Sequence, residues 1–113
     1  MPFIDSKITV PVTAEQKESI KSKLGKAISL MHKGESYLMV GIDDEYDLWM
    51  AGKKLDKGAF ISVSVFGDVS ADDADKMTAE ICRIMHDELG IPADKVYVKY
   101  QGVADWGWNG RNF

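Results

Sequence analysis

The sequence repeats its hydrophobic pattern at an offset of 57 residues, and this duplication limits the possible folds more than any other feature. Apolar and polar residues alternate in 3–10 and again in 60–66, the period-2 pattern of a β-strand. A second apolar strand, 37–42 and then 96–100, completes each copy. Between the strands, apolar residues at i, i+4, i+7 and i+8 predict an amphipathic helix. They are Ile20, Leu24, Ala27 and Ile28 in the first copy and Met77, Ile81, Ile84 and Met85 in the second.

Cap residues mark both ends of both predicted helices. Each helix begins after a hydroxyl residue that is followed, three positions on, by a residue with a side-chain acceptor, the arrangement of a capping box. Each ends at a glycine that can adopt the left-handed conformation. These positions are Thr13, Gln16 and Gly34 in the first copy and Ser70, Asp73 and Gly90 in the second.

The two copies, 2–45 and 59–102, each read as a βαβ unit. Two such units predict an α+β fold of βαββαβ order, with a four-stranded mixed sheet and both helices on one face. We expect residues 1–113 to form a single domain, in which 103–113 is a C-terminal tail between subunits.

The second face of the predicted sheet is too apolar to remain wholly in contact with water. It carries Phe3, Phe60, Ser62, Ser64 and Phe66. The outer strands would also expose unpaired backbone groups. Two short aromatic segments, 48–50 and 106–108, have the right size to pair with such edges in a neighbouring subunit. We therefore expect a homo-oligomer whose sheets face inward.

Composition excludes several classes of protein. The net charge is −4, from 14 Lys and Arg against 18 Asp and Glu, whereas a nucleic-acid-binding domain needs a concentrated basic surface. No apolar run approaches the roughly 18 residues of a membrane span. Asp5 and Lys7 interrupt any signal-peptide core. The single cysteine, Cys82, fits a reducing compartment. We expect a cytoplasmic protein with neither nucleic acid nor a membrane as a partner.

No cofactor or metal site is predicted. The sequence has no Gly-rich phosphate loop, no Gly-x-Ser-x-Gly and no His-Glu-x-x-His. Cys82 and His86 lie four residues apart on the second helix, but two ligands do not make a metal site. We interpret them as a buried thiol near a helix-terminal histidine.

Pro2 is a candidate general base. A small residue at position 2 generally allows removal of the initiator methionine, which would leave a secondary amine at the start of a strand. Burial against apolar residues, together with nearby lysines, would lower the pKa of that amine and keep it neutral near pH 7. Taken alone, the Met1-Pro2 start does not distinguish this role from a proline without function.

Three features together resemble the macrophage migration inhibitory factor family of the tautomerase superfamily, which uses an amino-terminal proline. They are Pro2 at the start of a strand in a doubled βαβ unit, the run from Gly90 to Tyr97, and Gly107-Trp108-Asn109 near the C-terminus. The resemblance covers essentially the whole chain. It implies a homotrimer in which three sheets form a barrel, with an active site built around Pro2 at each subunit interface.

The resemblance also implies roles for individual residues. Lys33 would bind the substrate carboxylate, and the backbone N–H of Phe66 would face the substrate. Ser64 and Val65 occupy adjoining positions. Tyr97 would enter the pocket from a neighbouring subunit, and the apolar wall would be formed by Trp106 and Trp108.

Three departures from the family pattern change these expectations. At Trp106 a smaller apolar residue is common in the family, and the larger ring would narrow the pocket. Lys99 replaces an asparagine, which exchanges a neutral hydrogen-bonding side chain for a cation that could contact a second carboxylate. The family's Cys-x-x-Cys is missing, because residues 57–66 contain no cysteine. The thiol oxidoreductase activity associated with that motif is therefore not expected here.

Three functions follow as hypotheses. The first is keto–enol tautomerisation of small aromatic 2-oxo acids such as phenylpyruvate, with Pro2 as the base. The second is a secreted, cytokine-like signalling protein, exported without a signal peptide, that binds a host cell-surface receptor and has only vestigial catalysis. The third is a ferredoxin-like small-molecule sensor in which Pro2 has no role.

Overall fold

The duplicated pattern folds into two βαβ units of matching layout. In the computed structural model, which describes residues 1–113, the first unit consists of β1 (Pro2–Ile8), α1 (Ala14–Ala27) and β2 (Met39–Asp43). The second consists of β5 (Ala59–Phe66), α2 (Ala71–Leu89) and β6 (Val96–Val103). Strands and helices of the second unit begin 57 residues after those of the first, which is the offset of the repeated hydrophobic pattern.

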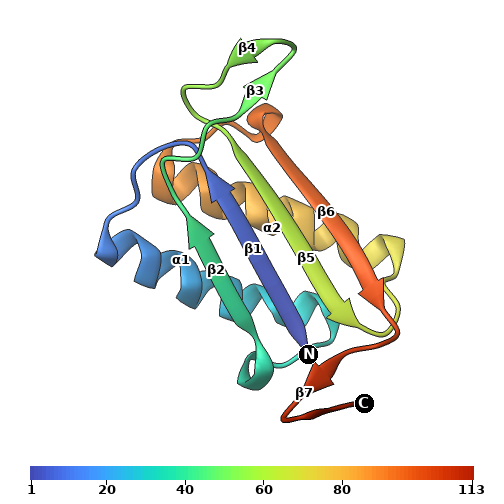
Figure 1. Cartoon of the computed structure of the whole chain (residues 1–113). Helices are drawn as coiled ribbons and strands as arrows, with labels where there is room; N and C mark the ends of the chain where they lie inside the picture. Colours follow the sequence, from blue (N-terminus) through green and yellow to red (C-terminus); the bar gives the residue numbers. More distant parts are fainter.

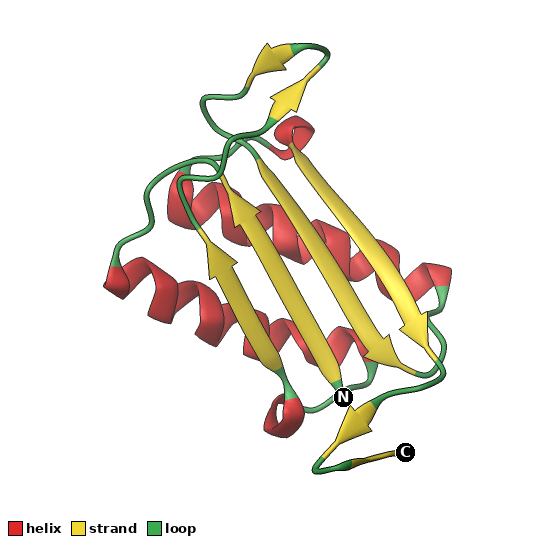
Figure 2. Ribbon diagram, in the orientation of Figure 1, coloured by secondary structure: helices red, strands yellow, loops and turns green.

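The four long strands form one mixed sheet in the order β2-β1-β5-β6. Strands β1 and β2 are parallel, as are β5 and β6, while β1 and β5 meet antiparallel at the centre. In that central pairing Pro2 lies opposite Val65 and Ile4 opposite Val63. Both helices cover the same face of the sheet (Figures 1 and 2), as the sequence predicted.

The core lies between this face and the two helices. Alternate residues of β1 and β5 are buried, as expected of strands with one covered face. All eight residues of the two predicted helical stripes are buried with them. Ser6 is the polar exception, because its Oγ is fully buried and has no hydrogen-bond partner.

The start of each helix is confirmed, but the end of the first is not. The Thr13 hydroxyl accepts the Gln16 N–H at 3.1 Å and the Gln16 side chain accepts the Thr13 N–H at 2.9 Å. After Ala27 the chain tightens into a 3₁₀ turn (Ile28–Met31), and His32, with φ 58°, adopts the left-handed conformation. The prediction that Gly34 would do so is wrong, since its φ is −89°. The 3₁₀ turn therefore ends the helical segment at His32, two residues before the predicted end at Gly34.

The predicted buried strand at 37–42 is also corrected. The strand is Met39–Asp43, and Tyr37 lies before it in a 3₁₀ turn (Glu35–Tyr37). Because β2 is at the edge of the sheet, its residues are half-buried or exposed rather than enclosed on both faces. Similarly, the first strand ends at Ile8 and not at Val10.

The two short aromatic segments form hairpins within the chain. Strand β3 (Trp49–Met50) pairs with β4 (Lys53–Lys54), and β7 (Gly107–Trp108) pairs with β8 (Arg111–Asn112). The hairpins lie at opposite ends of the sheet, with β7 near the N-terminus (Figure 1). Each short strand thus has one partner from its own chain. Their pairing with a neighbouring subunit remains a prediction.

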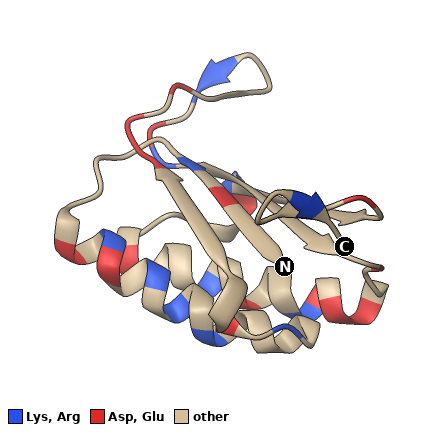
Figure 3. Ribbon diagram, turned by 60° about the horizontal axis from the view of Figure 1, so that its bottom comes forward, with Lys and Arg blue, Asp and Glu red and all other residues tan.

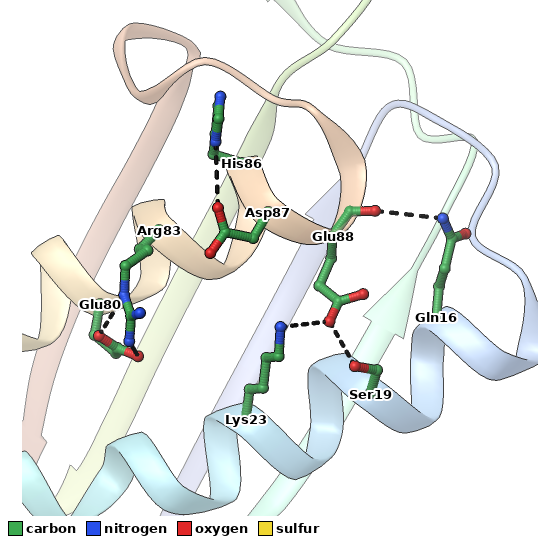
Figure 4. Close-up of polar contacts among 8 residues, drawn as sticks. All are labelled: Gln16, Ser19, Lys23, Glu80, Arg83, His86, Asp87 and Glu88. Carbon is green, nitrogen blue, oxygen red and sulfur yellow. Dashed lines mark hydrogen bonds and ion pairs between the residues drawn. The ribbon is translucent and has the colours of Figure 1, made fainter.

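Polar contacts join the exposed edges of the two helices. The Glu88 carboxylate of α2 lies 2.7 Å from the Lys23 ammonium and 2.5 Å from the Ser19 hydroxyl of α1 (Figure 4). The Gln16 side-chain amide donates to the Glu88 carbonyl oxygen at 3.4 Å. One basic side chain of α1, Lys23, therefore helps to hold the more acidic α2. Neither helix has the length and hydropathy needed to cross a bilayer.

Candidate active site

A cavity of about 690 Å³ lies at the end of the sheet where β1 begins. Pro2 is buried at its edge, with Met1, Phe3 and Ser64 beside it. A second wall comes from 36–39, the turn before β2 and the start of that strand. A third comes from Val103 and 106–108 of the C-terminal hairpin. Three segments that are far apart in the sequence therefore meet around Pro2.

The parallel pairing of β1 with β2 explains why the first two walls meet. Phe3 pairs with Met39, so both strands begin at the same end of the sheet. The third wall lies at this same end because β6 runs towards it and continues into the β7–β8 hairpin. There, Val103 lies opposite Phe66.

Four of the predicted site residues line this cavity, namely Pro2, Ser64, Trp106 and Trp108. Val65 takes part only through its backbone, because its side chain is fully buried in the core on the helix side of β5. The backbone of Val65 is paired with Pro2 across the central strands. Its side chain therefore cannot contact a molecule in the cavity.

Phe66 and Lys33, two further predicted residues, are hydrogen-bonded to each other at this end of the sheet. The backbone N–H of Phe66 donates to the Met1 carbonyl oxygen at 3.0 Å. Its carbonyl oxygen accepts a hydrogen bond from the Lys33 ammonium, also at 3.0 Å. One peptide group on each side of Phe66 thus binds the Met1 carbonyl oxygen and the Lys33 ammonium. Neither Phe66 nor Lys33 lines the Pro2 cavity itself, and both are linked to it through Met1.

The charge of Lys33 acts on the N-terminus. Partial burial of the Met1 amine lowers its pKa below the ordinary value of 8.0, and the Lys33 ammonium lowers it further. An amine in this corner of the molecule is therefore more easily deprotonated than a fully solvated one.

An aromatic cluster begins at Tyr37 and Trp108 in the cavity wall and continues outside it to Phe113 and Phe66. Tyr37 meets Trp108 edge to face at 5.7 Å between ring centroids, and Trp108 stacks on Phe113 at 6.2 Å. Phe113 also contacts Phe66 at 5.5 Å, and its N–H donates to the Trp106 carbonyl oxygen at 3.1 Å. The sequence reasoning missed Tyr37 and Phe113. Tyr37 could have been identified from the sequence, because it comes just before a strand that runs parallel to β1 and therefore starts at the same end of the sheet.

A single chain does not bring Tyr97 and Lys99 to this cavity. Pro2 lies opposite Val65, which in turn lies opposite Gly102, whereas Tyr97 lies opposite Phe60. The five residues from Tyr97 to Gly102 correspond to about 17 Å of strand. Tyr97 lines a different cavity, of about 360 Å³, beneath the β3–β4 hairpin. Its side chain is 62% exposed.

A model of the macrophage migration inhibitory factor (MIF) family matches residues 1–113. The chain belongs to this family. A MIF homolog of Trichuris trichiura is 25% identical over the full length of both chains. The MIF of Xenopus laevis is 33% identical over 64 residues, which are 55% of this chain and 56% of that protein.

The solved structures place this MIF-family chain in the same fold. The structure of Leishmania major MIF2 superposes with a TM-score of 0.93 at 26% identity, covering 100% of this chain and 97% of that one. A MIF homologue from Prochlorococcus marinus gives a TM-score of 0.88, also at 26% identity, with 98% of each chain covered. The predicted family and subunit fold are therefore confirmed.

The chemistry available at the MIF-family cavity is limited and specific. Pro2 supplies a ring nitrogen, which is a peptide nitrogen while Met1 precedes it. Next to the cavity, Lys33 supplies a cation, and the Phe66 N–H supplies a neutral donor that the carbonyl oxygen of the lining residue Met1 occupies. No cluster of three or more His, Cys, Asp or Glu side chains is arranged to bind a metal ion.

Proposed function

We propose that this protein is a keto–enol tautomerase of small aromatic 2-oxo acids such as phenylpyruvate. Removal of Met1 would free the Pro2 nitrogen as a secondary amine. That amine would then act as the general base at the cavity described above. No cofactor takes part in this proposal.

The hydrogen bond from the Phe66 N–H to the Met1 carbonyl oxygen is the observation that carries the proposal. Once Met1 is removed, this donor loses its partner while Lys33 stays bound to the other side of Phe66. A donor and a cation would then lie together next to the freed amine. This is the combination needed to bind a carboxylate and to orient its neighbouring carbonyl.

The reaction would need only one proton to move. The neutral Pro2 amine would take a proton from the carbon next to the keto group, and the electron pair of that C–H bond would form the C=C bond of the enol. The proton would then be returned to the carbonyl oxygen, so that substrate and product have the same atoms. Lys33 and the Phe66 N–H would stabilise negative charge as it moves towards oxygen. Trp106 and Trp108 would hold the aromatic ring and exclude water.

We further propose that the active unit is a homotrimer. Tyr97 and Lys99 are too far from Pro2 in one chain, so a neighbouring subunit would have to supply them. The half-buried side chains of Phe3, Phe60 and Phe66 support this, since an assembly would cover them further. In the trimer Lys99 would add a second cation to the site.

Insertion of an alanine between Met1 and Pro2 tests the proposal. The insertion converts the ring nitrogen permanently into a peptide nitrogen, and we expect phenylpyruvate turnover to fall by about 10²–10⁴-fold, the usual contribution of a general base. The control is Pro2→Gly, which keeps a free amine at the same position and should retain part of the activity. Mass spectrometry establishes the N-terminus of each protein, and sedimentation establishes its assembly. Unchanged turnover in the insertion variant would refute the proposal.

A second candidate function is binding to a cell-surface receptor by an exported protein. It is favoured by the family, whose curated relatives bear the name macrophage migration inhibitory factor. Receptor binding measured with the alanine-insertion variant separates the two functions. Retained binding without turnover would make signalling the main role and catalysis vestigial.

A further inference from the structure

Four lysines gather on the outer side of the β3–β4 hairpin, at the end of the sheet opposite Pro2. Lys53, Lys54, Lys57 and Lys95 line a single open groove of about 670 Å³, which we call the hairpin groove. Strand β4 appears in Figure 3 as a blue segment on the hairpin that projects from the sheet. This concentration of positive charge contrasts with the net charge of −4 for the chain.

Little of this charge is neutralised within the chain. Lys53 and Lys57 form no ion pair, and Asp56 is the only acidic residue that lines the groove. Lys54 lies 3.2 Å from Asp47. Lys95 also has an acidic neighbour, Asp94, at 3.7 Å, and that carboxylate is 77% exposed. Exposed pairs of this kind are weak and exchange readily with another anion.

The floor of the hairpin groove is apolar and firmly held. It includes Met50, Leu55 and Pro92. The Leu55 N–H donates to the Leu48 carbonyl oxygen at 2.9 Å, which closes the base of the hairpin. A Cβ on Gly58 would lie 2.6 Å from the Leu55 side chain and 3.2 Å from the Lys95 carbonyl oxygen, so these segments pack directly on each other.

Lys57 is positioned by the end of α2. A Cβ added to Gly90, the residue that ends the helix, would lie 3.4 Å from the Lys57 ammonium. Helix C-termini carry partial negative charge and favour a nearby cation. The lysine is therefore held at the groove without being paired to a carboxylate.

Strand β4 also has a free backbone edge. It pairs with β3 on one side and is the last strand of that small sheet on the other. An extended peptide can add to such an edge through main-chain hydrogen bonds, while its alternate side chains point to opposite faces. One set would lie over the apolar floor and the other near the lysines.

We propose that the hairpin groove binds an acidic, extended peptide segment of a protein partner, in which acidic and apolar residues alternate. The acidic side chains would pair with Lys53, Lys54, Lys57 and Lys95, and the apolar side chains would pack on Leu55 and Pro92. The apolar floor distinguishes this partner from a sulfated glycan, which carries the charges but has nothing to bury there. Within one chain the groove shares no residue with the Pro2 cavity, and the proposal does not depend on catalysis.

Fluorescence anisotropy with a labelled synthetic peptide of alternating glutamate and leucine tests this directly. We expect saturable binding that weakens as salt increases, because the ion pairs are exposed to solvent. The double variant Lys53→Glu/Lys57→Glu should weaken binding by about tenfold or more, since two attractive charges become repulsive. Lys21→Glu/Lys26→Glu on α1 is the matched control, because it makes the same change in net charge on a distant surface. It should leave binding within about twofold of the original protein.

Two further probes decide which chemistry is recognised. A peptide of alternating glutamate and serine keeps the charges without the apolar side chains, and it should bind at least tenfold more weakly. Heparin tests the sulfated glycan. The proposal is overturned if the glutamate–leucine peptide does not bind, if the α1 control weakens it equally, or if heparin and the glutamate–serine peptide bind as tightly as the glutamate–leucine peptide.

Discussion

The Phe66 N–H donates a 3.0 Å hydrogen bond to the carbonyl oxygen of Met1, a residue that lines the Pro2 cavity. Through this bond the first residue of the chain occupies the donor that we propose for substrate. The Lys33 ammonium is bound to the carbonyl oxygen of the same phenylalanine. Loss of Met1 would therefore do two things together, freeing the Pro2 amine and exposing the Phe66 donor.

The rate of tautomerisation should rise with pH through the pKa of the Pro2 amine and then level off. Only the neutral amine can accept a proton, so activity is lost as the pH falls below that pKa. Burial and the Lys33 ammonium lower the pKa of the Met1 amine, and we expect the same causes to act on Pro2. The midpoint in kcat/KM should lie below the ordinary range of α-amines, about 7.7–8.0. A rate that keeps rising well above that range would contradict this.

Lys33→Met should lower kcat/KM for phenylpyruvate by about 10–100-fold, because a hydrogen bond to a charged group contributes about 1.5–3 kcal/mol. Loss of the cation should also move the midpoint of the pH–rate profile upward, since one of the causes that lower the amine pKa is removed. Steady-state kinetics measure both effects. Lys26→Met, on the exposed surface of α1, is the control and should behave like the original protein. Equal kinetics for the two variants would show that Lys33 has no role in substrate binding or catalysis.

Ser6→Ala should increase the free energy of unfolding by about 1 kcal/mol. The Ser6 Oγ is fully buried without a hydrogen-bond partner, and an unsatisfied polar group in the core costs about 1–3 kcal/mol. Loss of the small side-chain volume offsets part of this gain. Urea denaturation measures the difference. The control is Ser62→Ala on the half-exposed face of β5, where a change of less than about 0.5 kcal/mol is expected. A destabilised Ser6→Ala protein would indicate a bound partner for the hydroxyl.

Glu88→Gln should reduce stability at neutral pH but have less effect in acid. The hydrogen bond from Lys23, followed by that from Ser19, lowers the pKa of Glu88 below its usual value of 4.5. A lowered carboxyl pKa contributes stability that is present above the unfolded pKa and is lost as pH falls through the folded pKa. We expect a loss of about 1 kcal/mol at pH 7, since Lys23 is well exposed. Denaturation as a function of pH measures it, and a loss that does not depend on pH would count against the ion pair.

Local patterns predicted the elements of the fold because their causes are local. The capping box at Thr13 and the glycine end at Gly90 depend on hydrogen bonds and backbone angles within one turn of helix. The error at Gly34 had a different origin. His32 adopts the left-handed conformation because the 3₁₀ turn before it packs Ile28 and Met31 into the core, and the sequence does not reveal that tightening.

The site was predicted less completely than the fold. Pro2, Ser64, Trp106 and Trp108 line one cavity, and their roles there remain predictions. Tyr37 and Phe113 were missed because their roles arise from contacts with Trp108, a residue distant from Tyr37 in the sequence. Val65 was misjudged for a simpler reason. Its position next to Phe66 places it on the opposite face of the strand, where its side chain enters the core.

The amino-acid sequence by itself determined the doubled βαβ architecture, because periodic burial of apolar side chains specifies both the type of each element and the face that it covers. The tertiary structure decided what surrounds Pro2. Strand pairing brought the turn at 36–39, the end of β5 and the C-terminal hairpin to one end of the sheet, while leaving Tyr97 and Lys99 about 10–17 Å away along β6. Such neighbourhoods depend on register and strand order, which are set by the packing of the whole domain and not by any one segment.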